Sequence, residues 1–172
     1  MSDFAHRLTL DRIRDGERID ITADEAECAA IAERLRLLSL DRLDAHVVVF
    51  RDGERIRASG RLKASLAQAC VATGEPVPEH VDEAFDLLFV PAPPPGSAEE
   101  IELGAAELDT LFHDGQAIDL GGAIADTLAL TLTPYPRSAD ADTALHEAGV
   151  LSEEEAGPFA ALAALKGKMS ET

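Results

Sequence analysis

The clearest pattern in the chain is an alternation of apolar and polar positions between residues 55 and 70. From Ile56 onward the even positions are mostly apolar and end at Cys70, whereas most odd positions are basic or small. A period of two is typical of a β-strand with one face toward a core. The run is long for a single strand, and Gly60 within it indicates a bend or a bulge. The pattern predicts a long strand with a basic outer face and an apolar inner face.

The flanking segments extend this strand into an antiparallel sheet. Residues 43–50 are rich in β-branched side chains, and the Asp52-Gly53 pair after them is typical of a tight hairpin. Residues 77–90 form the predicted return strand. Within it Glu83 breaks the apolar face, so we expect a bulge there. Shorter extended pieces are expected at 5–14, around Leu103 and around Leu111.

Two segments have the period of an amphipathic helix. The first spans residues 22–38 and begins with Thr22 as N-cap and Glu25 at the capping-box spacing. The second spans residues 119–131, begins at the N-cap Asp119 and is ended by the prolines that follow. The predicted fold class is therefore α+β: a curled, mostly antiparallel sheet with two packed helices.

The chain is expected to form one domain and a tail. Residues 1–136 contain every predicted strand and both amphipathic helices. Residues 137–172 are acidic, and their first part has few large apolar side chains, so we predict a mobile acidic C-terminal tail. Within it, residues 158–168 favour a short terminal helix, because Pro158 suits a first turn and apolar side chains recur every three residues.

Charge changes this picture, because it is distributed unevenly. The net charge is −18, which argues against indiscriminate binding to nucleic-acid phosphates. Residues 1–63 contain 12 Lys/Arg and 13 Asp/Glu, whereas residues 64–172 contain 3 and 20. Within residues 34–63 the balance is positive, with 8 basic side chains against 4 acidic ones. The sequence therefore describes a polarised protein.

The basic positions of the central hairpin are the candidate binding residues. They are Arg51, Arg55, Arg57, Arg61 and Lys63. One interpretation is an edge that contacts RNA phosphates. The other is local, because opposite charges on neighbouring strands attract. If residues 70 and 77 flank the turn, Arg61 lies opposite Asp86. In the same register Ser65 lies opposite Asp82. Two acids cannot neutralise five cations, so both interpretations stay open.

Motifs of catalysis and of membrane targeting are not found. The N-terminal residues have no apolar segment typical of a signal peptide, and no apolar run is long enough to span a membrane, so we expect a cytoplasmic protein. Cys28 lies on the apolar face of the first helix and is expected to be buried. Cys70 and His80 fall on opposite strand phases, which disfavours a nucleophile–base pair. The acidic cluster at residues 140–147 lacks the glycine turn of a calcium loop. No catalytic residue and no cofactor are predicted.

The order of the motifs resembles a known family. The segments "ACVATGEPVPEHVDEAFDLLFVP", "HDGQAIDLGGAIADTLALTLTPYPR" and "PFAALAALK" follow one another as in the YceD family, in its alphaproteobacterial form. The resemblance implies a non-catalytic bacterial factor that supports accumulation of 23S ribosomal RNA, through assembly of the large ribosomal subunit. RNA binding has been attributed to plastid relatives.

The resemblance also raises the question of a metal. Many relatives carry Cys-x-x-Cys at this hairpin, and some add cysteines in the tail, which is the ligand set of a zinc site. Here Cys70 occupies the first position and Thr73 the second, and the tail has no cysteine. We therefore predict no metal. The expected partner is ribosomal RNA, or else a basic ribosomal protein bound by an acidic adaptor without RNA contact. Neither DNA nor a membrane is expected as a partner.

Overall fold

The protein is described by a computed structural model, which places residues 4–93 and 109–150. The chain divides into two compact units. Unit 1 consists of residues 1–68 and 78–134, and unit 2 consists of residues 69–77 and 135–172. The predicted extended piece around Leu103, the terminal helix and most of the predicted tail lie outside the described residues.

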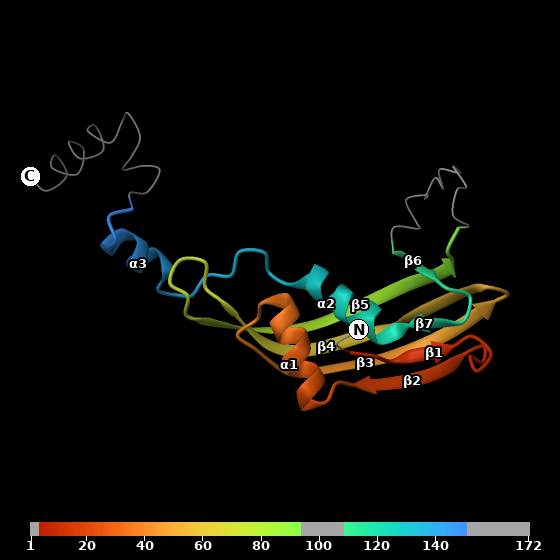
Figure 1. Ribbon diagram of the computed structural model, residues 1–172. Coiled ribbons are helices and arrows are strands. Elements are labelled where there is room, and N and C mark those ends of the chain that lie inside the picture. Colours follow the sequence, from red (N-terminus) through yellow and green to blue (C-terminus); the bar gives the residue numbers. More distant parts are fainter. Residues whose placement is uncertain (1–3, 94–108, 151–172) are drawn as a thin grey trace, which may run out of the picture. The chain divides into compact units, whose positions relative to one another are not determined.

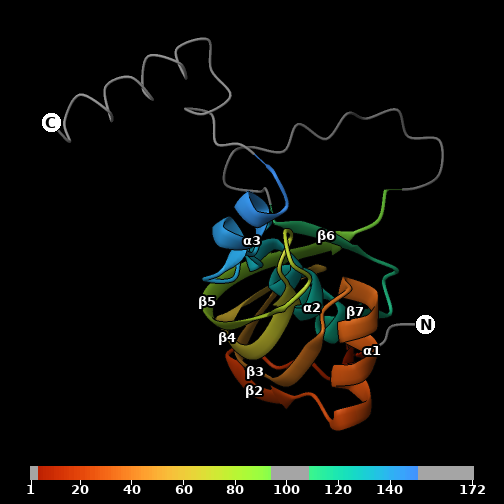
Figure 2. The same cartoon turned by 90° about the vertical axis from the view of Figure 1, so that its left-hand side faces the viewer.

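The main sheet has five strands in the order β2-β3-β4-β5-β6. Strands β2, β3 and β4 pair antiparallel, in a register that is continuous apart from one bulge. Strands β5 and β6 pair parallel. The strands are β2 (Glu17–Thr22), β3 (Ser39–Asp52), β4 (Arg55–Ala69), β5 (Pro76–Pro91) and β6 (Thr110–His113). Figures 1 and 2 show α1 and α2 on one face of this curved sheet. The predicted α+β class is confirmed.

The alternation along β4 is confirmed residue by residue. Ile56 and Leu62 are fully buried on the inner face, while Arg57 and Arg61 are exposed on the outer face. The register between β3 and β4 passes through Gly60 without a shift, so the predicted bulge does not occur in this pair of strands. A Cβ at this position would lie 2.1 Å from the carbonyl oxygen of His46 on β3. Glycine is therefore required by a close approach of two strands.

The hairpin between β3 and β4 follows the prediction. Asp52 pairs with Arg55, which leaves a two-residue loop in which Gly53 has a φ of 62°. The irregularity in this pair of strands lies elsewhere, between Leu40 and Arg42.

The first helix begins two residues later than predicted. α1 spans Glu25–Leu35, and its N-cap is Asp24, whose carboxylate accepts a hydrogen bond from the Glu27 backbone N–H. Glu27 completes a capping box with this residue. Thr22 instead ends β2, which the sequence analysis did not predict, and its hydroxyl donates to Asp44.

The second helix begins where the sequence predicted. α2 spans Leu120–Thr131, and the Asp119 carboxylate accepts a hydrogen bond from the Gly122 N–H. Before it, β7 (Ala117–Asp119) pairs with β1 (Arg7–Thr9) as a separate two-stranded sheet. β1 confirms the centre of the extended piece expected at 5–14. β7 is too short for its alternation to be read from the sequence.

Glu83 keeps the phase of its strand. Val81 and Phe85 are both buried on either side of it, so the side chains alternate through this point without the reversal that a bulge would cause. Glu83 is nevertheless exposed, although it lies on the inner side of β5. An inward-pointing carboxylate that stays in contact with water indicates that the core is open there.

Unit 2 contains the turn between β4 and β5 and the helix α3 (Ala141–Glu147). The polar composition of residues 137–157 did not predict this helix. No helix among the described residues is long and apolar enough to cross a membrane.

Candidate nucleic-acid interface

Four of the five predicted RNA-binding residues lie on one face. Arg55, Arg57, Arg61 and Lys63 alternate along β4 and point away from the core. Arg51 does not join them. It pairs with Ile56, so it belongs to the inner phase of β3. Its guanidinium donates hydrogen bonds to the carbonyl oxygens of Gly53, at 3.0 Å, and of Leu10.

Aspartates of β5 hold most of these cations. Arg57 donates from Nε to Oδ1 of Asp86 at 2.7 Å, and its terminal nitrogen donates to the other carboxylate oxygen. Arg61 donates to Asp82, and the Lys63 Nζ lies 3.4 Å from the same carboxylate. These three ion pairs are therefore local, as one of the two interpretations expected.

The predicted partner of Arg61 was wrong. Arg61 binds Asp82, four residues nearer the turn than the predicted Asp86. The Ser65 hydroxyl contacts His80, at 3.1 Å. The sequence-based register counted back from an assumed turn, whereas a long arginine side chain reaches along the neighbouring strand to the carboxylate with the best geometry.

The ion pairs also fix the charge states of their members. The hydrogen bond that Arg57 donates to Asp86 raises the pKa of Arg57, and the one that Arg61 donates to Asp82 raises the pKa of Arg61. In return, Arg61 lowers the pKa of Asp82 and Arg57 lowers the pKa of Asp86. Both carboxylates therefore stay ionised at neutral pH and offset part of the positive charge of the β4 face.

Two arginines on this face have no such partner. Arg55 and Arg18 are exposed, and neither makes a side-chain hydrogen bond or an ion pair within the described part of the chain. Arg18 lies on β2, which pairs with β3, and its partner in the register is Val48. Nothing in the sequence placed Arg18 on this face, because β2 is too short to be predicted from its own pattern.

An aromatic side chain lies between these two cations. Phe50 is 45% exposed on the outer face of β3 and pairs with Arg57 across the ladder. Nucleic-acid bases stack on exposed aromatic rings, so a phenylalanine among arginines is a suitable platform for a single strand. The alternation in residues 43–50 contained this signal, since Phe50 falls on the phase opposite to the buried Val47 and Val49.

The turn in unit 2 gives Cys70 a polar environment. Its Sγ accepts hydrogen bonds from the Ser138 backbone N–H, at 3.3 Å, and from the Ser138 hydroxyl, at 3.5 Å. The Thr73 hydroxyl lies 3.4 Å from the same serine hydroxyl. These donors, Ser138 first and then Thr73, lower the pKa of Cys70 to about 6. The side chain is buried, as its strand phase predicted.

Hydroxyls therefore surround the cysteine where a zinc site would need thiolates. Within residues 4–93 and 109–150, no three His, Cys, Asp or Glu side chains are grouped so that they could hold a metal ion. Thr73 and Ser138 are neutral donors, which suit a lone sulfur and make poor zinc ligands. The absence of a metal stays a prediction.

The comparisons with known proteins identify the family. No curated protein and no solved structure matches the chain. Residues 58–166, which are more than half of the chain, match the model of a family described as large ribosomal RNA subunit accumulation protein YceD. That description supports a role related to the ribosome and names no catalytic activity. The chain belongs to the YceD family.

Proposed function

We propose that this protein is a non-catalytic factor in assembly of the large ribosomal subunit and contacts ribosomal RNA through the outer face of its sheet. The family description gives the ribosomal context. The observation that carries the contact is the group formed by Arg18, Phe50 and Arg55. It combines two cations that form no ion pair with any described residue and an aromatic ring between them. Such a factor would act in the cytoplasm.

The proposed contact is small and specific. Asp82 and Asp86 already bind Arg57, Arg61 and Lys63, so these three residues would have to exchange a carboxylate for a phosphate. Arg18 and Arg55 need no such exchange. With a net charge of −18 the rest of the molecule repels RNA, which limits binding to strands that reach this group.

Titration of the purified full chain with a single-stranded fragment of 23S ribosomal RNA tests this proposal. Binding is expected at low salt. It should weaken in the variant Arg18→Gln with Arg55→Gln, and also in Phe50→Ser. The control is Arg42→Gln, because Arg42 lies in the same sheet and already binds Asp44. Absence of binding at low salt, or equal binding by all variants, would overturn RNA contact.

A second candidate is an acidic adaptor that binds a basic ribosomal protein without touching RNA. The ion pairs of the outer face favour it, because Arg57, Arg61 and Lys63 already bind aspartates and need no phosphate. Salt-sensitive capture of a basic ribosomal protein by the full chain, together with no RNA binding at low salt, would select the adaptor over the RNA-contacting factor.

A further inference from the structure

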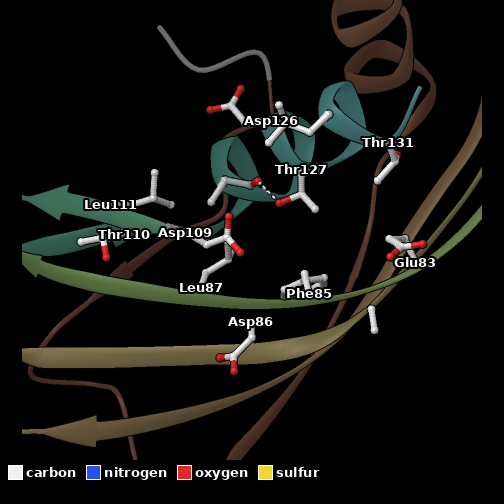
Figure 3. A pocket seen from close by; sticks show the side chains of 13 residues that line it. Glu83, Phe85, Asp86, Leu87, Asp109, Thr110, Leu111, Asp126, Thr127 and Thr131 are labelled. Carbon is white, nitrogen blue, oxygen red and sulfur yellow. Dashed lines mark hydrogen bonds between the residues drawn. The ribbon is translucent and has the colours of Figure 1, made fainter. Parts of the chain in front are cut away.

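A groove of about 590 Å³ runs along β5, between α2 and the start of β6. Figure 3 shows its side chains, with α2 above and β5 below. Five consecutive residues of β5, from Glu83 to Leu87, line it. A strand shows only alternate residues on either face, so five in succession mean that the edge of the strand borders the groove.

This edge carries backbone groups that no other strand uses within residues 4–93 and 109–150. β6 covers β5 only over Leu88–Pro91. The Leu88 N–H donates to the Asp109 carbonyl, so the backbone groups of even-numbered residues point toward that side. By the same alternation, the N–H and C=O groups of Ala84 and Asp86 point into the groove. An edge of this kind is a template for a further strand.

The open edge is bounded at both ends. At one end, the Thr133 hydroxyl donates to Glu79 at 2.9 Å, which brings the chain after α2 beside β5. At the other end β6 begins, with Thr110 beside Leu88. The edge between them has room for one short extended segment.

Apolar surface lines the groove on two sides. Phe85 and Leu87 form its floor. On α2, the Thr127 hydroxyl donates to the Ala123 carbonyl, a hydrogen bond drawn in Figure 3, and the Thr131 hydroxyl donates to Leu128. These hydroxyls are satisfied within the helix and do not need a ligand. Leu130 borders the groove with 84% of its surface exposed, which adds accessible apolar surface to the groove.

Every charged side chain that lines the groove is acidic. These residues are Glu83, Asp86, Asp109 and Asp126. Asp86 binds Arg57 on the outer face, and Asp126 lies 3.3 Å from Arg34. Glu83 and Asp109 have no ion pair within the described residues. The groove thus offers apolar contacts and unused negative charge beside a free strand edge.

We propose that this groove binds an extended, cationic segment of a partner protein, which adds to the edge of β5 as a strand. Main-chain hydrogen bonds to Ala84 and Asp86 would align the segment, its apolar side chains would cover Leu87 and Leu130, and its Lys or Arg side chains would meet Glu83 and Asp109. The inference rests on the protein-binding part of the second candidate function and holds whether or not the outer face contacts RNA.

Charge argues for a foreign segment over the other occupants. The chain's own residues 94–108 contain four glutamates and no lysine or arginine. A second copy of the chain brings a further net charge of −18. Both would place carboxylates beside Glu83 and Asp109, whereas a basic segment removes the repulsion that exists there already.

The test uses the full chain and a fluorescently labelled hexapeptide with the sequence Lys-Val-Lys-Leu-Lys-Val. Fluorescence anisotropy should show binding at least about tenfold tighter than that of Glu-Val-Glu-Leu-Glu-Val or of Lys-Gly-Lys-Gly-Lys-Gly, because charge and apolar contact both contribute. In nuclear magnetic resonance spectra, the backbone amides of Ala84 and Asp86 should shift on binding. Equal binding of the three peptides, or shifts confined to other strands, would overturn the proposal.

Variants separate the groove from general acidity. Glu83→Lys with Asp109→Lys should abolish peptide binding, and Leu130→Asp should weaken it at little cost to folding, because Leu130 is exposed. The matched control is Glu33→Lys with Asp41→Lys, which makes the same charge change at two exposed positions outside the groove. If the control lowers affinity as much as the groove variant, binding is general and the proposal is wrong.

The other occupants give distinct results. Slow hydrogen exchange at Ala84 and Asp86 in the free protein, with no peptide binding, would mean that the chain's own residues pair with this edge. A dimer in sedimentation that is lost in Leu130→Asp would mean that a second copy does. Either result contradicts the proposal. RNA binding should be unchanged in Leu130→Asp, so failure of the peptide test leaves the RNA proposal untouched.

Discussion

At the scale of single residues, the absence of a Cβ at Gly60 allows β3 and β4 to approach closely. Ala at this position would meet the His46 carbonyl, a backbone atom that cannot move without shifting β3. Gly60→Ala is therefore expected to lower the free energy of unfolding by about 1–3 kcal/mol, the usual cost of forcing extra volume into a packed interior. Urea denaturation measures this change. Ser59→Ala is the matched control, and a Gly60→Ala protein as stable as the wild type would contradict the close approach.

Cys70 is the residue whose chemistry the structure changes most. Its pKa is lowered to about 6 by hydrogen bonds from Ser138 and Thr73, whereas burial raises the pKa of Cys28 above its ordinary value. The ultraviolet absorbance of thiolate should therefore rise in a first step near pH 6, and this step should be missing in Cys70→Ala. In Ser138→Ala the step should move to higher pH. A wild-type protein without a step below pH 8, well under the ordinary thiol pKa of about 8.5, would refute the assignment.

The same shift has a consequence for stability. Because the Cys70 pKa is lower in the folded protein than in the unfolded chain, the unfolded chain binds more protons between the two values. Its contribution to stability should therefore be complete above the ordinary thiol pKa and should be lost as pH falls through about 6. The difference in unfolding free energy between the wild type and Cys70→Ala, measured at several pH values, should increase as pH rises. A difference independent of pH would contradict this prediction.

At the scale of elements, the caps decide where α1 begins. Thr22 with Glu25 and Asp24 with Glu27 have the same spacing, so the sequence offers two capping boxes. The structure uses the second, because Thr22 is needed as the last residue of β2. Asp24→Ala should lower stability by about 1 kcal/mol, and Asp24→Asn, which retains the cap, should cost much less. Thermal unfolding compares the two. Equal losses would mean that the Asp24 cap does not stabilise α1.

The strands divide into those that their own sequence specifies and those that their neighbours specify. β4 and β5 were predictable because each is long enough to show a period of two, and α2 because Asp119 caps a continuous apolar face. β2 and β7 were not, since a few residues give no reliable period and their pairing depends on β3 and β1. The residues of the candidate site differ in the same way in how far the sequence predicts them. Its β4 cations were found in the sequence, whereas Arg18 and the groove beside β5 depend on which strands lie next to each other.

At the scale of the whole molecule, the charge is separated between surfaces. The net charge is −18, and the carboxylates of β5 reach the basic face on one side and the groove on the other. Asp86 belongs to both, because its side chain binds Arg57 and its backbone borders the groove. A polarised molecule of this kind can bring a cationic protein close to an RNA strand without binding RNA indiscriminately.

The salt dependence of RNA binding measures how many cations the outer face contributes. For single strands, the logarithm of the affinity falls with the logarithm of the salt concentration by about 0.7 per phosphate neutralised. If all five predicted residues bound phosphates, the slope would be about −3.5 by the same rule. The ion pairs leave Arg18 and Arg55 as the available cations, so we expect a slope of about −1.4.

The variants identify which residues set this slope. Arg18→Gln with Arg55→Gln should bring it close to zero, because no unpaired cation then remains at the proposed contact. Arg57→Gln with Arg61→Gln should change the slope much less, since these residues already form ion pairs with Asp86 and Asp82. Should the second pair of substitutions remove most of the slope instead, RNA displaces the aspartates on binding. The β4 face would then be open to RNA in spite of its ion pairs, and the contact would be the larger one that the sequence first suggested.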